Sequence, residues 1–279
     1  MSTLRRRFSN RGSHNSTGVT GFEKRLLDSK IRTWWIYLGV MVVLSGVYLL
    51  FDLTSGPLFT VLSFAPVVAI LVGVRWTKPE LRTPWYLLAI GQFSFAMGDL
   101  IAYNYETFFH AALPFPSLAD GLYVLMYPFL LYAGVLFIER VPKEEVHHTK
   151  SDILIVIAVA AAVMSLFVAP ILLGSQTFNY DWLSIFYPVM DLIFLVVLIE
   201  VRLTPSPTSY YVLMFGVFCL LAVDAIYAYG TVTQTAFDYT GSVLDVGWLT
   251  YYACLGAAAL TQNGERPFVP MEDGLSEGE

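Results

Sequence analysis

Five aspartates are the residues of this chain most able to do chemistry, because each lies within or at the edge of a long apolar segment. They are Asp99, Asp120, Asp191, Asp224 and Asp245. A charged side chain inside a membrane costs about 2.5–3.5 kcal/mol on insertion scales, so such residues are functional candidates by default. The sequence places no Lys or Arg near them. Carboxyl groups clustered without a cation should disfavour one another's ionisation or attract a cation.

Aromatic residues follow two of these acids at the same spacings of three and seven. The two sets are Asp120 with Tyr123 and Tyr127, and Asp245 with Trp248 and Tyr252. These spacings share one helix face. We therefore predict an aromatic-walled pocket with an acidic floor, completed by Asp99, Asp191 and Asp224, which would bind a cation or an amine.

Each candidate also has a structural explanation. Ser117-Leu-Ala-Asp120 and Ser242-Val-Leu-Asp245 both match a capping box, in which the acid supports free backbone donors at a helix start. Asp99 and Asp224 lie late in their helices, near the negative end of the dipole, so a Tyr hydroxyl, a proton, a cation or a ligand must compensate. Asp191 could be a protonated acid hydrogen-bonded in the bundle. Most of the aromatic residues fit an interfacial belt.

The acids belong to a chain that reads as an all-α polytopic membrane protein. It is 56% hydrophobic and only 14% charged, whereas a soluble domain carries about 25% charge. The charge is missing from stretches long enough to cross a bilayer at about 1.5 Å per residue. We predict eight spans, at about 34–51, 58–75, 85–103, 118–138, 153–173, 182–200, 209–229 and 242–261.

The distribution of basic residues gives this topology its orientation. With the N-terminus inside, all 16 Lys and Arg residues fall on the cytoplasmic side, and the four outer loops contain none. Such a partition is the positive-inside pattern. We therefore predict a multi-pass protein of the cell membrane with both termini cytoplasmic. Counted from the inner ends, Asp191 would lie about 15 Å deep and the other four acids about 25 Å.

An internal repeat relates the two halves of the chain. Shifted by 125 residues, 86–135 aligns without gaps on 211–260, and the pairs Asp99/Asp224 and Asp120/Asp245 coincide. Leu and Ala matches are common in membrane sequences, but two matching acids are not. We predict two four-helix units of the same orientation, related by an approximate two-fold axis along the membrane normal.

These predictions divide the chain into five parts. They are a basic cytoplasmic tail at 1–33, a first membrane unit at 34–138, a cytoplasmic loop at 139–151, a second membrane unit at 152–262 and an acidic cytoplasmic tail at 263–279. The apolar residues between Phe22 and Ile31 fit either a short amphipathic helix on the membrane or a solvated linker.

Several chemistries lack the residues that they require. No Lys lies in a predicted span, which excludes a retinal Schiff base, and all four His residues lie outside the spans, which argues against paired haem ligation. Motifs for nucleotide binding, zinc proteases and serine hydrolases are missing from the sequence. We predict no catalytic residue and no cofactor, and leave any metal open. Cys219 and Cys254 lie within spans and cannot form an extracellular disulfide.

Several stretches resemble a known family. Gly98-Asp99, Pro114-Phe-Pro-Ser-Leu-Ala-Asp120-Gly-Leu-Tyr123 and Tyr127-Pro128 are similar to the N-terminal multi-pass membrane region of bacterial GGDEF/EAL proteins, the cyclic-di-GMP cyclases and phosphodiesterases. The likeness covers about 34–262. In that family the membrane region is an input module, which implies a sensory or regulatory role. Because the sequence holds no cyclase or phosphodiesterase domain, we expect a separate partner, another role, or a membrane portion alone.

Three functions remain open at this stage. The first is a sensory or regulatory membrane module that binds a ligand or cation near the outer face. The second is a small secondary transporter or ion-coupled carrier, which internal repeats and a mid-membrane Asp191 would suit. The third is a structural subunit whose aspartates only cap helices and accept hydrogen bonds. Expected partners are membrane lipids and either a cytoplasmic signalling protein or a second copy of the chain, but not nucleic acid.

Overall fold

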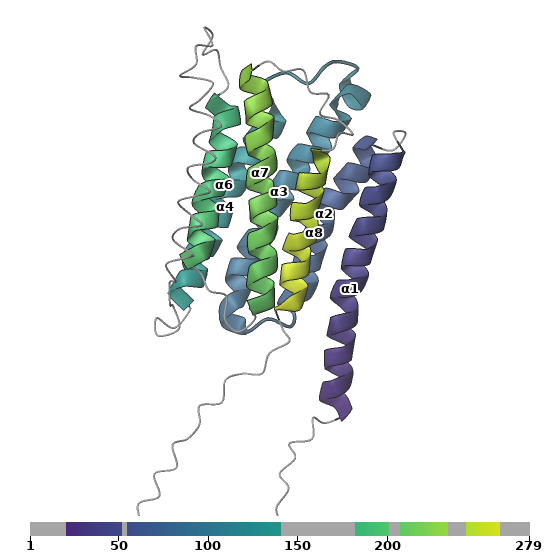
Figure 1. Cartoon of the computed structure of the whole chain (residues 1–279), viewed down its shortest axis with the longest axis vertical. Coiled ribbons are helices and arrows are strands. Elements are labelled where there is room, and N and C mark those ends of the chain that lie inside the picture. The colour runs from purple at the N-terminus through teal and green to yellow at the C-terminus, as the bar shows by residue number, and fades with distance from the viewer. Residues whose placement is uncertain (1–20, 52–54, 141–181, 201–206, 234–243, 263–279) are drawn as a thin grey trace, which may run out of the picture.

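Every regular element of the described chain is a helix. The computed structural model describes residues 21–51, 55–140, 182–200, 207–233 and 244–262, and no strand occurs in these ranges. The helices are α1 (Gly21–Leu50), α2 (Ser55–Val74), α3 (Pro79–Phe109), α4 (Leu118–Arg140), α6 (Trp182–Glu200), α7 (Pro207–Thr233) and α8 (Asp245–Thr261). They lie roughly parallel to one long axis in a single bundle (Figure 1).

Most of these helices are long and apolar enough to span a membrane. Candidate spans occur in α1, α2, α3, α4 and α7, and α6 contributes the shorter apolar stretch Ile185–Ile199. The prediction of an all-α membrane protein with several spans is therefore confirmed. The predicted span at 153–173 lies outside the described residues, so the count of eight spans stays a prediction. Residues 1–20 of the predicted N-terminal tail, the predicted loop at 139–151 apart from its first two residues, and the predicted tail at 263–279 also lie outside the described residues.

The largest differences from the predicted spans are in α1 and α3, which are both longer than expected. α1 begins at Gly21, so the stretch expected to be a separate amphipathic helix or a linker continues into the first span as one helix. α3 continues beyond the expected end at 103 to Phe109, where His110 adopts a left-handed conformation (φ 51°). Asn104 holds the added turns to α2, because its Nδ2 donates to Thr60 Oγ1 at 3.0 Å. A polar residue satisfied by a neighbouring helix need not end its own helix.

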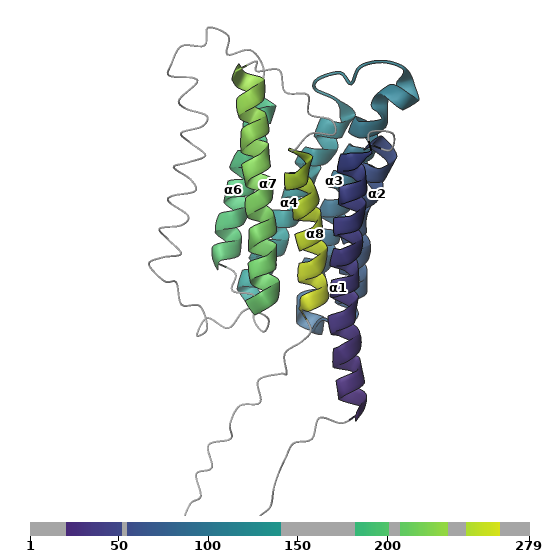
Figure 2. The same ribbon diagram turned by 45° about the vertical axis from the view of Figure 1, so that its right-hand side comes forward.

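Six helices form a closed ring, and α1 lies outside it. Around the ring, α2 contacts α3, α3 contacts α4, α4 contacts α6, α6 contacts α7, α7 contacts α8, and α8 returns to α2. α1 packs against α8 and α2, at the edge of the bundle in Figure 2. Its outward side exposes Trp35, Val42, Val43 and Leu50, as expected for a helix face turned to lipid.

Two tyrosines fasten α1 to the ring. The Tyr37 hydroxyl donates to the backbone oxygen of Tyr252 at 2.8 Å, and the Tyr48 hydroxyl donates to Asp245 Oδ2 at 2.5 Å. Both partners lie on α8. A helix that buries little apolar surface is therefore held by hydrogen bonds, which strengthen in surroundings of low dielectric constant.

Small residues let the ring helices approach closely. A Cβ atom added at Gly73 of α2 would collide with the backbone oxygen of Ala259 in α8, and one added at Gly216 of α7 would lie 2.6 Å from the Cβ of Cys254. Ser209 on α7 also donates to the backbone oxygen of Ala258 at 2.6 Å. Membrane helices commonly associate through small residues, because lipid supplies no hydrophobic drive between helices.

The basic residues of the described ranges gather at one end of the bundle axis. The Lys and Arg residues of the described ranges lie at the end where α1 and α3 begin and where α2 and α4 end: Lys24, Arg25, Lys30, Arg32, Arg75, Lys78, Arg82 and Arg140. Asp120 and Asp245 lie at the opposite end, in the first turns of α4 and α8. α1 begins and α8 ends at the basic end (Figure 1).

The close contact between α2 and α8 can be tested at Gly73. Gly73→Ala should lower the free energy of unfolding by about 1–3 kcal/mol, because the added methyl group meets backbone atoms that cannot rotate away. Gly46→Ala on α1 is the control, since a Cβ there meets nothing within 4 Å. Thermal unfolding in detergent would measure both. Equal stability of the two variants would contradict the close approach.

Candidate ligand site

Hydrogen bonds from tyrosine to aspartate join the first half of the bundle to the second. Each links a helix of the set α1–α4 to a helix of the set α6–α8. Besides the Tyr48–Asp245 bond, they are Tyr252 to Asp99 Oδ2 at 2.5 Å, Tyr103 to Asp245 Oδ1 at 2.9 Å, Tyr127 to Asp191 Oδ1 at 2.9 Å and Tyr187 to Asp120 Oδ1 at 3.0 Å. Of the compensating groups expected for Asp99, which were a Tyr hydroxyl, a proton, a cation or a ligand, the structure contains tyrosine hydroxyls.

Two further bonds occupy matching positions in the two halves. The Tyr123 hydroxyl of α4 donates to Asp99 Oδ1 of α3 at 3.0 Å, and Trp248 Nε1 of α8 donates to Asp224 Oδ1 of α7 at 2.8 Å. Donor and acceptor are 24 residues apart in each case. Gly98 leaves room for the Tyr123 ring beside Asp99. Helix pairs α3–α4 and α7–α8 thus present an acid and an aromatic donor in the same register.

The two predicted capping boxes have different outcomes. Asp120 Oδ2 accepts from Ser117 N at 2.7 Å and from Ser117 Oγ at 2.8 Å, while Asp120 N donates to Ser117 Oγ at 3.4 Å. This capping box is confirmed. Ser242 lies outside the described residues, and both carboxylate oxygens of Asp245 accept from tyrosines of α1 and α3. Asp245 is therefore a fully buried link between the two halves.

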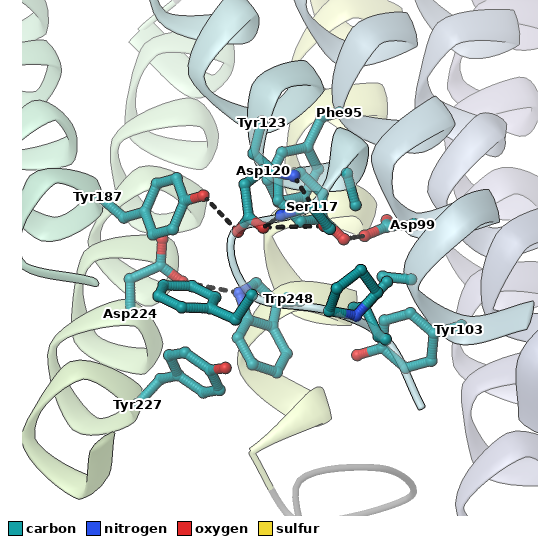
Figure 3. A pocket seen from close by; sticks show the side chains of 15 residues that line it. Phe95, Asp99, Tyr103, Ser117, Asp120, Tyr123, Tyr187, Asp224, Tyr227 and Trp248 are labelled. Carbon is teal, nitrogen blue, oxygen red and sulfur yellow. Dashed lines mark hydrogen bonds between the residues drawn. The ribbon is translucent and has the colours of Figure 1, made fainter. Parts of the chain in front are cut away.

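A cavity of about 320 Å³ lies between the two halves. Side chains from α3, α4, α6, α7 and α8 line it together with the connection from α3 to α4 (Figure 3). Three carboxyl groups reach its wall, from Asp99, Asp120 and Asp224. Seven aromatic rings surround them: Phe95, Tyr103, Phe115, Tyr123, Tyr187, Tyr227 and Trp248. None of the lining residues is Lys, Arg or His, so the wall has acidic charge without a basic partner.

The cavity contains some of the residues predicted from the sequence and not others. Asp99, Asp120, Asp224, Tyr123 and Trp248 line it. The remaining four predicted residues do not line the cavity but support it, since each takes part in one of the hydrogen bonds above: Asp191, Asp245, Tyr127 and Tyr252.

Five aromatic residues that line the cavity were absent from the predicted site: Phe95, Tyr103, Phe115, Tyr187 and Tyr227. Tyr103 and Tyr227 fitted the interfacial aromatic belt, so their types alone did not single them out. Tyr187 lies four residues before Asp191 and hence on the same face of α6. That spacing could have identified it, in the way that the spacing from Asp120 identified Tyr123.

Asp191 lies at a different level from the one predicted. The sequence placed it about 10 Å nearer the inner helix ends than the other acids, whereas the structure brings its carboxyl group within hydrogen-bonding reach of that of Asp224. The prediction was wrong because it assumed that all inner helix ends lie at one depth. Helices in a bundle are offset along their axes by packing, and α6 packs directly against α7.

Metal ligation has little support in this arrangement. No group of three or more His, Cys, Asp or Glu side chains able to hold a metal ion occurs among the described residues. Cys219 and Cys254 are free thiols. The three carboxyl groups at the cavity accept hydrogen bonds from Tyr, Trp and Ser, and each stands beside aromatic rings. Carboxylates interleaved with ring faces suit an organic cation better than a bare divalent ion, which requires several converging oxygens.

Comparison of the chain with models of protein families, with curated proteins and with solved structures gave no match. A proposal for its function therefore rests on the geometry of the cavity.

The bond from Tyr252 to Asp99 should contribute measurably to stability. Tyr252→Phe removes the donor to Asp99 Oδ2 without changing the ring, so the unfolding free energy should fall by about 1–3 kcal/mol. Tyr86→Phe is the matched control, because Tyr86 is exposed on the same bundle. The comparison is made by thermal unfolding in detergent. If the two variants are equally stable, the bond does not hold the halves together.

Proposed function

We propose that this protein is a membrane sensory or regulatory module that binds an organic cation in the cavity between its two halves. The observation that carries the proposal is the composition of the cavity wall: three carboxyl groups and seven aromatic rings, with no basic side chain among the described residues that line it. An ammonium group is attracted both by the carboxylates and by the faces of aromatic rings, and the second attraction contributes about 0.5–2 kcal/mol per contact.

The size and burial of the cavity favour a small ligand. A volume of about 320 Å³ is at the lower end of the range of about 300–1,000 Å³ typical of ligand pockets. Asp99 and Asp224 are only 3% and 8% exposed. A cation that reaches them must give up most of its water. Weakly hydrated quaternary or bulky ammonium ions lose less hydration free energy in this step than small inorganic cations do.

The position of the cavity favours sensing. Its wall is shared by both halves, and tyrosine–aspartate bonds between the halves lie beside it. A ligand that contacts both halves favours one packing of the bundle over another, and such a population shift is what a signal requires. The resemblance to membrane input modules supports the same role. We propose further that the basic end is cytoplasmic, which would place the cavity toward the outer face and both termini inside.

The matching acid–aromatic pairs support a repeat of two four-helix units. Tyr123–Asp99 and Trp248–Asp224 are equivalent under the 125-residue shift. The proposal includes eight spans and an approximate two-fold axis through the cavity. Such an arrangement would give one ligand site two related acidic walls.

Binding can be tested with choline and its neutral isostere, 3,3-dimethylbutan-1-ol. Choline should raise the melting temperature of the full chain in detergent. At a concentration 100 times its dissociation constant, choline should stabilise the folded chain by about 2.7 kcal/mol. The alcohol should leave the melting temperature unchanged. The double variant Asp99→Asn/Asp224→Asn should lose the response. Glu106→Gln, which removes an exposed acid of α3 that does not line the cavity, should keep it.

Other outcomes would support the alternative functions. Accumulation of radiolabelled choline in sealed vesicles containing the wild type, but not the double variant, would indicate a carrier. A double variant that is merely less stable, with no response of the wild type to choline or to other amines, would leave the aspartates with a structural role and refute the proposal.

A further inference from the structure

We propose that Asp191 and Asp224 hold one exchangeable proton between them, and that a cation entering the cavity releases it. This inference rests on the proposed function, because it concerns the same cavity. It adds that the ligand and a proton compete for one site, so that the protein responds to the ligand and to pH together.

The hydrogen bonds of Asp191 leave one oxygen without a donor. Asp191 is 0% exposed, and its Oδ1 accepts from Tyr127 at 2.9 Å. Its Oδ2 is buried and accepts from no group that the structure describes. The neighbouring carboxyl group is that of Asp224, whose Oδ1 accepts from Trp248 at 2.8 Å. A proton carried by one carboxyl group and accepted by the other would satisfy the remaining oxygen.

The groups around the pair provide no positive charge. Tyr127 of α4, Tyr187 of α6 and Tyr251 of α8 face the two acids, together with Trp248. All are neutral, and no Lys, Arg or His is among the described groups that act on the pair. Two adjacent carboxylates in such surroundings repel each other, so the pair is most stable with a single proton.

The position of Asp224 links this proton to the cavity. Asp224 lines the cavity, whereas Asp191 lies behind it. A bound ammonium ion beside Asp224 supplies the positive charge that the proton supplies in the empty site. When the cation enters, the O–H bond of the shared proton breaks and the proton leaves to solvent. The net charge of the site is −1 in both states, either two carboxylates with a proton or two carboxylates with a cation.

Asp99 is the natural comparison within the same cavity. Both of its oxygens accept from tyrosine hydroxyls, Tyr123 at 3.0 Å and Tyr252 at 2.5 Å. A carboxyl group that accepts two hydrogen bonds has no need of a shared proton. The inference therefore distinguishes Asp191 and Asp224 from Asp99, although all three are buried acids of the same bundle.

Calorimetry of choline binding would measure the released proton. The full chain is titrated at one pH in phosphate and in Tris. The difference between the two heats of binding gives the number of protons released. We expect about one proton per choline, with an apparent affinity that rises about tenfold per pH unit while the pair is protonated. In Asp191→Asn the side-chain amide replaces the proton donor, so binding should persist with no proton release and no pH dependence. Choline binding by the wild type without proton release would overturn the inference.

Infrared titration tests the proton without a ligand and separates the two proposals. The carbonyl band of a protonated carboxyl group should be present in the wild type and in Asp99→Asn, and absent from Asp191→Asn and Asp224→Asn. If the band is present but choline does not bind, the proposed function and the release of the proton by a cation are both refuted. The sharing of a proton by Asp191 and Asp224 is then still supported. If the band is absent from the wild type, the pair holds no proton and the inference is refuted.

Discussion

The bundle depends on the hydrogen bonds that its buried acids accept from aromatic side chains. An unpaired carboxylate in an apolar interior is strongly unfavourable, so each acid needs donors within a few ångströms. In this chain the donors are tyrosine and tryptophan rather than Lys or Arg. A neutral donor reduces the penalty without cancelling the charge. The acids therefore remain able to attract a cation, which a salt bridge with a lysine would prevent.

The same hydrogen bonds decide which parts of the bundle can move together. Within a half, helices such as α3 and α4 approach closely through glycines, and added atoms would collide with the neighbour. Between halves, glycines also allow close approach, at Gly73 against Ala259 and at Gly134 against Val197, whereas the polar contacts around the cavity are mostly single hydroxyl bonds. Tight packing resists displacement more than isolated hydrogen bonds do. Displacement of the helices that meet at the cavity, where the two halves are joined by single hydroxyl bonds, is thus the change most accessible to a ligand.

Much of the fold could be predicted from the sequence, because crossing a membrane requires a minimum length of apolar residues. The predicted limits of α4 and α6 agree with the structure within two residues. The buried aspartates could be identified because the residues around them in the sequence carry no charge. The partners of those acids could not be predicted. Tyr187 meets Asp120, and Asp191 meets Asp224, only because α6 has a particular offset against α4 and α7. That offset depends on packing between helices, which a local pattern does not encode.

The attachment of α1 has a geometric consequence for the far end of the molecule. This helix is straight in outline, bound by Tyr48 near one end and by Tyr37 near its middle, and otherwise turned largely to lipid. Between Tyr37 and Gly21 it extends for about 24 Å at the rise of an α-helix, so a tilt of about 5° about Tyr37 would displace Gly21 by about 2 Å. Tyr48 is bound to Asp245, in the first turn of α8. A tilt of α1 would therefore couple a small movement of Tyr48, which is bound to the buried Asp245, to a larger movement of Gly21 at the basic end.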